Sequence, residues 1–211
     1  MSGDKAPNCN IKGAIKFIKN PQSEDTKVIL YGTENILSNN ANLLNKYKDR
    51  ISYCIANDII TMKDKPSYAF KNKRNSSLIK IIDDLYDKKI SGGVSSGNTG
   101  ALLTSALLIL GKIKGIKRPA LAPFIPIEGS GFILCDAGAN STVKPENLFQ
   151  FAIMSSAYLE HLGLNKNPRI ALLNIGSEEN KGNELTIESF KLLKDNLPNF
   201  IGNIESREIF D

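Results

Sequence analysis

Short apolar runs alternate along the chain with longer segments in which apolar residues recur every three or four positions. The short runs predict β-strands, and the periodic segments predict α-helices. The expected strands are residues 27–31, 51–56, 92–95, 132–136, 169–175 and 199–204. The expected helices are residues 10–19, 42–48, 66–87, 101–110, 145–162 and 184–195. Strands that alternate with helices of this length are typical of an α/β fold with a mostly parallel sheet.

The composition is that of a globular protein: 211 residues, of which 41% are hydrophobic and 23% are charged. This length predicts a single domain over residues 1–211. The richest apolar run is too short for a membrane span, and the N-terminus lacks the apolar core of a secretory signal. The cysteines, Cys9, Cys54 and Cys135, are odd in number and widely spaced. Their spacing favours reduced thiols in the cytoplasm over a disulfide framework or a zinc site.

The net charge of +5 is concentrated in the first 90 residues, which hold 16 Lys and Arg against 10 Asp and Glu. The basic excess is greatest between residues 63 and 80. Such a run is either an ordinary solvated face or a surface that attracts an anionic partner. Nucleic acid is not indicated, because the chain has no aromatic-rich binding motif and no zinc-finger spacing. An acidic carrier protein or a phosphate group fits equally well.

Three segments rich in Gly, Asn and Ser or Thr follow expected strands and precede expected helices: residues 95–100 (SSGNTG), 136–147 (DAGANSTVKPEN) and 176–184 (GSEENKGNE). In parallel sheets, ligands bind at the carboxyl ends of the strands. Free N–H groups at helix N-termini attract anions there. One such loop alone is equally typical of a turn or a helix cap, but three in one chain favour phosphate binding. The two standard nucleotide-binding glycine patterns are not matched.

Longer stretches identify a family. The opening MSGDKAPN, the segment SSGNTGALLTSALLIL, the segment FILCDAGANSTVKPENLFQF, and RIALLNIGSEENKGNE followed by NFIGNIESREIF resemble the phosphate acyltransferase (PlsX) family over essentially the whole chain. The resemblance implies a three-layer α/β/α fold, similar to phosphotransacetylases and isocitrate-type dehydrogenases. It also implies a cytoplasmic homodimer, with peripheral membrane association. The implied reaction converts acyl-acyl-carrier-protein and inorganic phosphate to acyl phosphate, for bacterial phospholipid synthesis, without a cofactor or metal.

The resemblance and the chemistry of the reaction together assign roles to residues. Phosphate is itself the nucleophile, so the site needs a cation and hydrogen-bond donors and no catalytic triad. Lys181 is the expected catalytic cation, and Asn183 is the second expected catalytic residue, which together with Glu184 shapes the loop of Lys181. The expected phosphate-binding residues are Ser96, Gly97, Asn98, Thr99, Gly100 and Asn140, with Gly3 and Asp4 at the border of the site. The expected carrier-protein docking residues are Lys71, Lys73 and Arg74, while Ser76 and Ser77 beside them are alternative phosphate contacts.

Simpler interpretations stay open for several of these residues. Lys181 could be a solvent-exposed loop lysine, Asn140 a turn residue, and Glu184 an acid that complements a helix dipole. His161 is expected to be structural or at the surface. The cysteines lie in no reactive-looking motif, so an acyl-cysteine intermediate is not favoured.

Compared with the family pattern, the chain begins inside the N-terminal MGGD-x-A-P motif and ends before a D-G-F-x-G-N motif that contributes to the family's site. We therefore expect a chain that is incomplete at both ends. Three functions stay open: an active acyltransferase; a non-catalytic fragment that binds phosphate, carrier protein or a partner subunit; and a phosphotransacetylase that uses coenzyme A, which these motifs match poorly.

Overall fold

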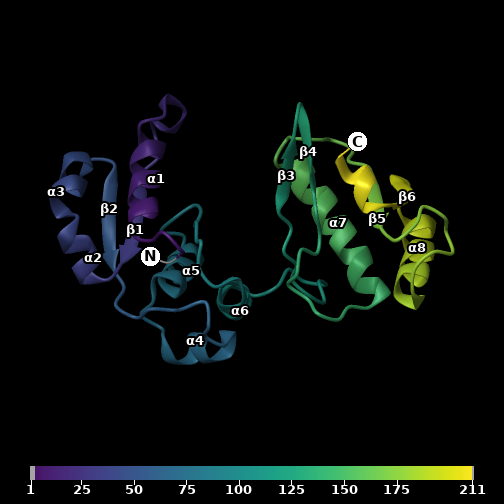
Figure 1. Ribbon diagram of the computed structural model, residues 1–211, viewed down its shortest axis with the longest axis horizontal. Helices are drawn as coiled ribbons and strands as arrows, with labels where there is room; N and C mark the ends of the chain where they lie inside the picture. The colour runs from purple at the N-terminus through teal and green to yellow at the C-terminus, as the bar shows by residue number, and fades with distance from the viewer. Residues whose placement is uncertain (1–2, 211) are drawn as a thin grey trace. The chain divides into compact units, whose positions relative to one another are not determined.

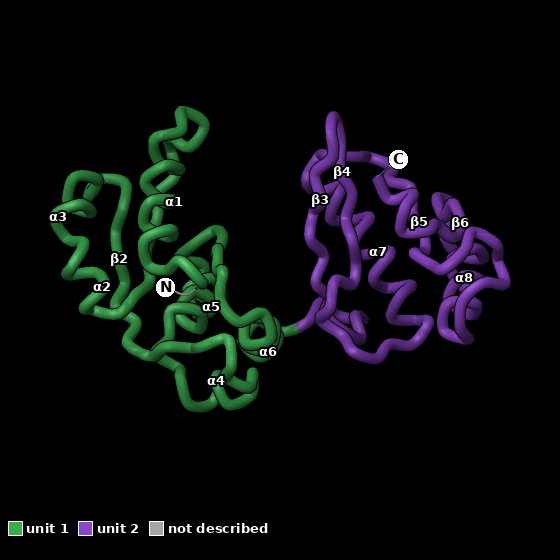
Figure 2. Tube along the Cα trace, in the orientation of Figure 1, with its two compact units in different colours: residues 1–111 green, residues 112–211 purple. Residues whose placement is uncertain are grey.

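The computed structural model describes residues 3–210. The chain divides after Gly111 into two compact units, unit 1 (residues 1–111) and unit 2 (residues 112–211), which Figure 2 shows in different colours. The expectation of one domain over the whole chain stays a prediction.

Unit 1 begins with a helix and then alternates strands and helices (Figure 1). Its elements are α1 (Asn8–Ile18), β1 (Val28–Gly32), α2 (Glu34–Asn39), α3 (Ala41–Leu44), β2 (Ile51–Ile55), α4 (Pro66–Asn72), α5 (Ser77–Tyr86) and α6 (Thr99–Ile109). Strands β1 and β2 pair in parallel, with Val28 opposite Ile51 and Gly32 opposite Ile55. Because parallel strands end at the same edge of a sheet, the segments that follow Gly32 and Ile55 begin side by side.

The two faces of β1 are covered by different helices, because neighbouring side chains of a strand point to opposite sides. Leu30 is buried in a cluster with Ile11 of α1 and Leu44 of α3. The next residue, Tyr31, is 5% exposed, and its hydroxyl donates a 2.6 Å hydrogen bond to the Asp84 carboxylate of α5. Within unit 1, helices therefore lie on both sides of the strand pair.

A second core joins α4, α5 and α6. Its fully buried members include Ala69, Ile79 and Ala101. Gly100, in the first turn of α6, allows this close packing, because a Cβ there would lie 2.7 Å from Pro66 Cγ. Helix α6 is apolar around most of its circumference but has only 11 residues. In the part of the chain that the structure describes, no helix combines the length and apolarity needed to cross a bilayer.

Unit 2 contains a hairpin, a long helix and a second parallel strand pair. Its elements are β3 (Phe124–Ile127), β4 (Ser130–Ile133), α7 (Pro145–His161), β5 (Ile170–Leu173), α8 (Glu184–Asn196) and β6 (Phe200–Ile204). Strands β3 and β4 are antiparallel, whereas β5 and β6 are parallel. Helix α8 packs on β6 through an edge-to-face contact between Phe190 and Phe200, whose ring centroids lie 5.2 Å apart.

The structure confirms the α/β class expected from the sequence, with parallel pairing of β1 with β2 and of β5 with β6. Within residues 3–210 the strands form separate pairs and not one continuous sheet. The expected helix at 66–87 is interrupted at 73–76, and Ser76 is the N-cap residue of α5. The expected strand at 132–136 is the end of the β3–β4 hairpin, which stops at Ile133.

The expected strand at 92–95 is wrong. These residues have irregular backbone that forms no strand. Val94, the only large apolar residue of the run, is 95% exposed. Two glycines and one unburied valine supply too little apolar surface to hold a strand against a neighbour.

The hydrogen bond between Tyr31 and Asp84 generates a prediction about stability. Tyr31→Phe should lower the free energy of unfolding by about 1–2 kcal/mol at pH 7, because it removes a hydrogen bond to a charged acceptor. This bond, ahead of the opposing effect of burial, holds the pKa of Asp84 below its usual range. The stabilisation is therefore present above the usual carboxyl pKa and is lost as pH falls through the lowered one.

Urea unfolding at pH 7 and near pH 3 measures this difference, with Tyr68→Phe as the control because Tyr68 is 53% exposed. The difference in the free energy of unfolding between wild type and Tyr31→Phe should be smaller at the lower pH. A gap of the same size at both pH values would contradict the account.

Candidate functional site

A groove in unit 2 lies at the carboxyl ends of β5 and β6, next to the beginning of α8. Its lining comes from the end of β5, from the start of α8 and from the segment after β6: Leu173, Asn174, Ile175, Gly182, Asn183, Thr186 and Ser206. We call it the α8 groove. This is the position at which parallel α/β sheets bind ligands, because the loops and the helix N-terminus converge there.

Lys181 lies in the loop between β5 and α8, immediately before two residues that line the α8 groove. The aliphatic part of its side chain lies over Gly176, where an added Cβ would be 3.0 Å from Lys181 Cγ. Its ammonium is 3.6 Å from the Glu178 carboxylate, and about half of the side chain is exposed. A single exposed ion pair of this kind is weak, so Lys181 can exchange Glu178 for an anionic ligand.

Asn183 begins α8 as its N-cap residue. Its Oδ1 accepts a 3.0 Å hydrogen bond from the Thr186 N–H, which is the usual role of Asn at this position. In the described part of the chain its Nδ2 has no hydrogen-bond partner, so it can donate to a ligand. Together with the first N–H groups of the 13-residue helix α8, it supplies donors directly after the loop that carries Lys181.

Acidic residues limit the positive charge around the groove. Glu178 pairs with Lys181, and Glu184 lies in the first turn of α8. Glu179 forms an ion pair with Lys194 of α8, with 2.6 Å between Oε1 and Nζ. An anion at this position therefore depends on Lys181 and on the donors at the helix N-terminus.

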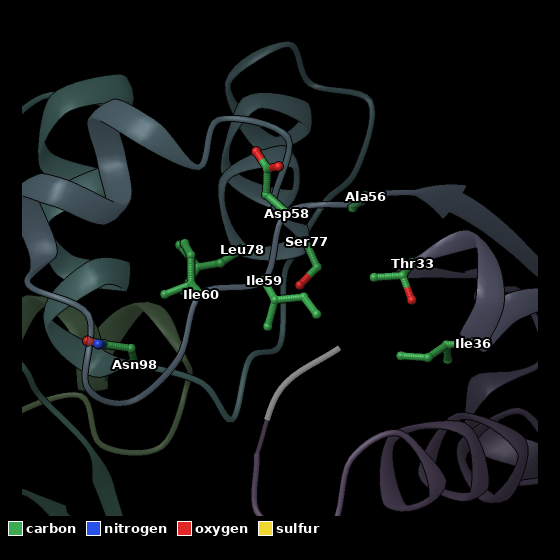
Figure 3. A pocket seen from close by; sticks show the side chains of 9 residues that line it. All are labelled: Thr33, Ile36, Ala56, Asp58, Ile59, Ile60, Ser77, Leu78 and Asn98. Carbon is green, nitrogen blue, oxygen red and sulfur yellow. The ribbon is translucent and has the colours of Figure 1, made fainter.

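Unit 1 has a pocket at the corresponding edge of its own parallel pair (Figure 3). It is lined by Thr33 and Ile36 after β1, by residues of the 56–60 segment after β2, by Ser77 and Leu78 of α5, and by Asn98. In Figure 3, Thr33 and Ile36 lie on one side and Asn98 on the other. The beginnings of α2, α5 and α6 thus border one pocket, which also contains Asp58 and several isoleucines.

Asn98 is the structural centre of the SSGNTG loop. Its Oδ1 caps α6 by accepting from the Ala101 N–H at 2.9 Å. Its Nδ2 donates to the carbonyl oxygens of Thr61 and Asp64, both at 3.0 Å. The side chain is 7% exposed, so it joins the loop to the 61–64 segment. A direct contact with phosphate would come from the backbone of this loop.

The structure brings the N-terminal motif onto the same loop. Gly3 has φ +112°, and a Cβ there would lie 2.5 Å from Ser96 Oγ. Asp4 follows at the surface. Within unit 1, two of the segments assigned to the phosphate site are therefore neighbours. Lys181, Asn183 and Asn140 belong to unit 2, and the assignment of all these residues to phosphate stays a prediction.

Asn140 belongs to a closed hydrogen-bond network around Asp136. The Asp136 carboxylate accepts from Leu121 N at 2.7 Å and from Asn140 N at 2.8 Å. The Asn140 side chain donates to Asp136 and to the carbonyl oxygen of Pro119. Partial burial acts to raise the pKa of Asp136, but these hydrogen bonds outweigh it and lower that pKa. The interactions of Asn140 in the structure therefore hold two loops together.

The three residues expected to dock a carrier protein differ in their surroundings. Lys73 is bound internally: its Nζ contacts the Asp64 carboxylate at 2.6 Å and the carbonyl oxygen of Ile59 at 2.7 Å. Arg74 stacks on the ring of Phe70 and pairs loosely with Asp83 at 3.4 Å. Lys71, on α4, and Arg74 are both exposed, so these two are more accessible than Lys73.

Other candidate residues are less suited to chemistry. Burial raises the pKa of the Cys135 thiol, which disfavours the reactive thiolate. His161 is exposed at the end of α7, as the surface interpretation predicts. The Ser76 hydroxyl is buried and has no hydrogen-bond partner among the described residues, and it does not line the pocket that contains Ser77.

Sequence reasoning missed three residues that shape the loop of Lys181. Gly182 has φ +94° and is packed against Asn174 and Thr186. Asn174 and Asn203 donate from their side chains to backbone carbonyl oxygens of the loop. The signal was available, because Asn174 directly follows an apolar strand and Asn203 lies inside another one.

Comparison with known structures defines the fold class. The EutD phosphotransacetylase from Staphylococcus aureus superposes with a TM-score of 0.61 over 92% of this chain and 64% of that chain, at 16% sequence identity. At this identity the similarity establishes the fold alone, which is the fold that the sequence resemblance implied.

The family follows from the sequence. The family described as "Fatty acid synthesis protein" matches residues 1–211, and the chain belongs to it. The chain is 43% identical over 209 residues to the phosphate acyltransferase of Clostridium novyi, covering 99% of this chain and 62% of that protein. It is 42% identical to the phosphate acyltransferase of Bacillus subtilis and 46% identical to that of Dictyoglomus thermophilum, covering 100% of this chain and 62% of each relative. The chain thus spans less than two thirds of the length of these relatives.

The packing of Gly182 generates a second prediction. Gly182→Ala should destabilise unit 2, because a Cβ there would overlap Thr186 Oγ1 and lie 2.5 Å from Asn174 Oδ1 at a positive φ. Gly138→Ala is a matched control: φ there is +99°, but the space around its Cβ is open. Thermal or urea unfolding should show Gly182→Ala to be less stable than the control by about 1–3 kcal/mol. Equal stabilities would mean that the loop relaxes freely around the new methyl group.

Proposed function

We propose that this chain binds inorganic phosphate in the α8 groove and transfers an acyl group to it from the thioester of an acidic carrier protein, which gives acyl phosphate for phospholipid synthesis. The observation that carries the proposal is the position of Lys181 and Asn183 at the carboxyl edge of β5 and β6, where α8 begins. The family membership and the names of the relatives support the same reaction.

Phosphate binding in this proposal is electrostatic. The ammonium of Lys181 leaves Glu178 and pairs with phosphate, while the Asn183 amide and the first N–H groups of α8 donate to its other oxygens. A bound dianion is then held in one orientation, which converts a collision between two solutes into attack within a complex. The backbone of the SSGNTG loop in unit 1, together with Gly3 and Asp4, is also assigned to phosphate binding. Helix α6 follows this loop and begins at Thr99, and its first N–H groups are donors of the same kind.

The chemical step needs no nucleophile from the protein. A phosphate oxygen attacks the thioester carbonyl carbon, and negative charge develops on the carbonyl oxygen. This attack forms the acyl–phosphate C–O bond; the tetrahedral intermediate then collapses with cleavage of the C–S bond, and the carrier leaves as a thiolate that takes up a proton. Lys181 stabilises the charge in this sequence, and no covalent intermediate on the partly buried Cys135 is required.

The docking surface for the carrier protein is assigned to α4. Lys71 is exposed there, and Tyr68, one turn earlier on the same helix, is 53% exposed. Basic and apolar side chains at one surface fit an acidic helical partner that is attracted over distance and then packs. Arg74 is assigned a secondary part, and Lys73 supports the surface by fixing the 59–64 segment.

Further properties implied for the family belong to the same proposal: a cytoplasmic location, a homodimer and peripheral association with the membrane. A phosphotransacetylase that uses coenzyme A is the second candidate; the EutD phosphotransacetylase shares the fold, but the sequence motifs match this candidate poorly. The two functions differ in the thiol that is released, so one assay with both thioesters separates them.

The role of Lys181 is tested by phosphate-dependent thiol release, with hydroxylamine trapping of the acyl phosphate. Lys181→Ala should lower the rate at least about a hundredfold, because the loss of one charge stabiliser in such a site costs about 3 kcal/mol. Lys191→Ala is the control, since Lys191 is an exposed lysine of α8. Equal rates for Lys181→Ala and wild type would refute the assignment, and release of coenzyme A but not carrier protein would favour the second candidate.

The role of α4 is tested by charge reversal. Lys71→Glu should raise the KM for acyl carrier protein about threefold to tenfold at low salt and leave the KM for phosphate unchanged, because it repels an acidic partner during encounter. The difference from wild type should shrink at high salt. Lys12→Glu, at an exposed position of α1, is the control. The same effect at both positions would indicate a response to net charge alone.

A further inference from the structure

Two asparagines at the ends of the parallel strands hold the loop that carries Lys181. Asn174, directly after β5, donates from Nδ2 to the carbonyl oxygen of Lys181 at 3.0 Å. Asn203, in β6, donates from Nδ2 to the carbonyl oxygen of Glu178 at 2.8 Å. That carbonyl also accepts from the Lys181 N–H at 3.1 Å. The backbone of Lys181 is thus fixed on both sides, once directly and once through Glu178.

The local backbone of β6 turns Asn203 toward this loop. The register of β5 and β6 shifts between the pair Ile170–Phe200 and the pair Leu172–Asn203, so β6 contains one extra residue there. Gly202, just before Asn203, has φ +106°, which glycine adopts without strain. A bulge of this kind re-aims the side chain that follows it.

The stability of the fold alone does not explain why Asn203 is buried at this position. It is 7% exposed, and its Oδ1 has no hydrogen-bond partner among the described residues. A buried acceptor without a donor is unfavourable. The Glu178 carbonyl would remain hydrogen-bonded to the Lys181 N–H without Asn203, so no buried backbone group needs this side chain to satisfy it.

We infer that Asn203 and Asn174 are positioning residues. They hold the backbone of Lys181 in the place that it needs for phosphate binding at the α8 groove. The inference rests on the proposed function, because it assigns phosphate to Lys181. Asn203 acts through Glu178: it fixes the carbonyl to which the Lys181 N–H is bonded. Asn174 acts on Lys181 itself and on the turn that places Gly182 and Asn183 in the groove lining.

The experiment compares Asn203→Ala with Asn199→Ala on the full 211-residue chain. Asn199 is a matched control, because its Nδ2 also donates to a backbone carbonyl oxygen, that of Pro168 at 2.7 Å. That bond lies at the opposite end of the same strand pair. Asn174→Ala is a second test variant that releases the loop from the other side. Melting temperatures establish that all variants are folded.

Two measurements are made on each variant. Hydrogen exchange of the Lys181 amide should be about fivefold faster in Asn203→Ala, because one hydrogen bond no longer opposes opening of the loop, and unchanged in Asn199→Ala. The dissociation constant for inorganic phosphate, measured by NMR titration beside Lys181→Ala, should rise about threefold to tenfold in Asn203→Ala and Asn174→Ala and stay at the wild-type value in the control.

The outcomes separate the inference from the proposed function. Unchanged exchange of the Lys181 amide in Asn203→Ala, or equal changes in the control, would overturn the positioning role. Wild-type phosphate affinity in Asn203→Ala beside lost affinity in Lys181→Ala would also overturn it, while the phosphate site would stand. No phosphate binding by the wild-type chain would overturn the proposed function and the purpose assigned to the two asparagines; the exchange measurement would still decide whether Asn203 holds the loop.

Discussion

Parallel strand pairing is the constraint from which the functional parts of this chain follow. Two parallel strands end at one edge, and the chain must then leave that edge through loops that lead into helices. In unit 1 this places Thr33, the 56–60 segment and the starts of α5 and α6 around one pocket. In unit 2 it places the loop of Lys181, the start of α8 and the segment after β6 around a groove. Free N–H groups collect at both edges because helices begin there.

Asparagine side chains fix these edges. An amide can donate to one backbone group and accept from another, so it can join a loop to a helix or to a second loop. Asn98 caps α6 and binds the 61–64 segment, and Asn140 joins the loops at Pro119 and Asp136. Asn174 and Asn203 each donate from Nδ2 to a backbone carbonyl oxygen of the loop of Lys181. Asn98 and Asn140, which the sequence analysis assigned to phosphate, therefore use their side chains mainly to hold loops in place. In unit 2, the free amide of Asn183 and the ammonium of Lys181 are available for an anion.

The sequence predicted the elements whose signals are local. The runs at 27–31, 51–56, 169–175 and 199–204 have no competing periodicity and correspond to β1, β2, β5 and β6. The sequence did not predict β3, the first strand of the hairpin, because prolines at positions 119, 123 and 126 argue against a strand. The break between α4 and α5 depends on a tertiary contact, in which Ser76 pairs with Asp58. Spacing alone does not reveal such a contact.

Some features of the candidate site could likewise be predicted from the sequence, and others could not. The loop at 176–184 and the N-cap position of Asn183 could be predicted, because a strand, a Gly- and Asn-rich turn and a helix follow one another in the sequence. The internal binding of Lys73 and the bond from Asn140 to Pro119 could not, because these contacts span 9, 14 and 21 positions through loops and follow no helix or strand period. The role of Tyr31 is the clearest case: its partner, Asp84, is 53 residues away.

The central claim is that an anion with the shape of phosphate binds beside Lys181. The most direct measurement is the anomalous scattering from crystals of this chain grown with arsenate, which has the geometry and charge of phosphate. The account predicts one ordered arsenate in the α8 groove, within hydrogen-bond distance of Lys181 Nζ and of the Asn183 amide, and its absence in Lys181→Ala crystals. Arsenate bound elsewhere, with the α8 groove empty, would contradict it.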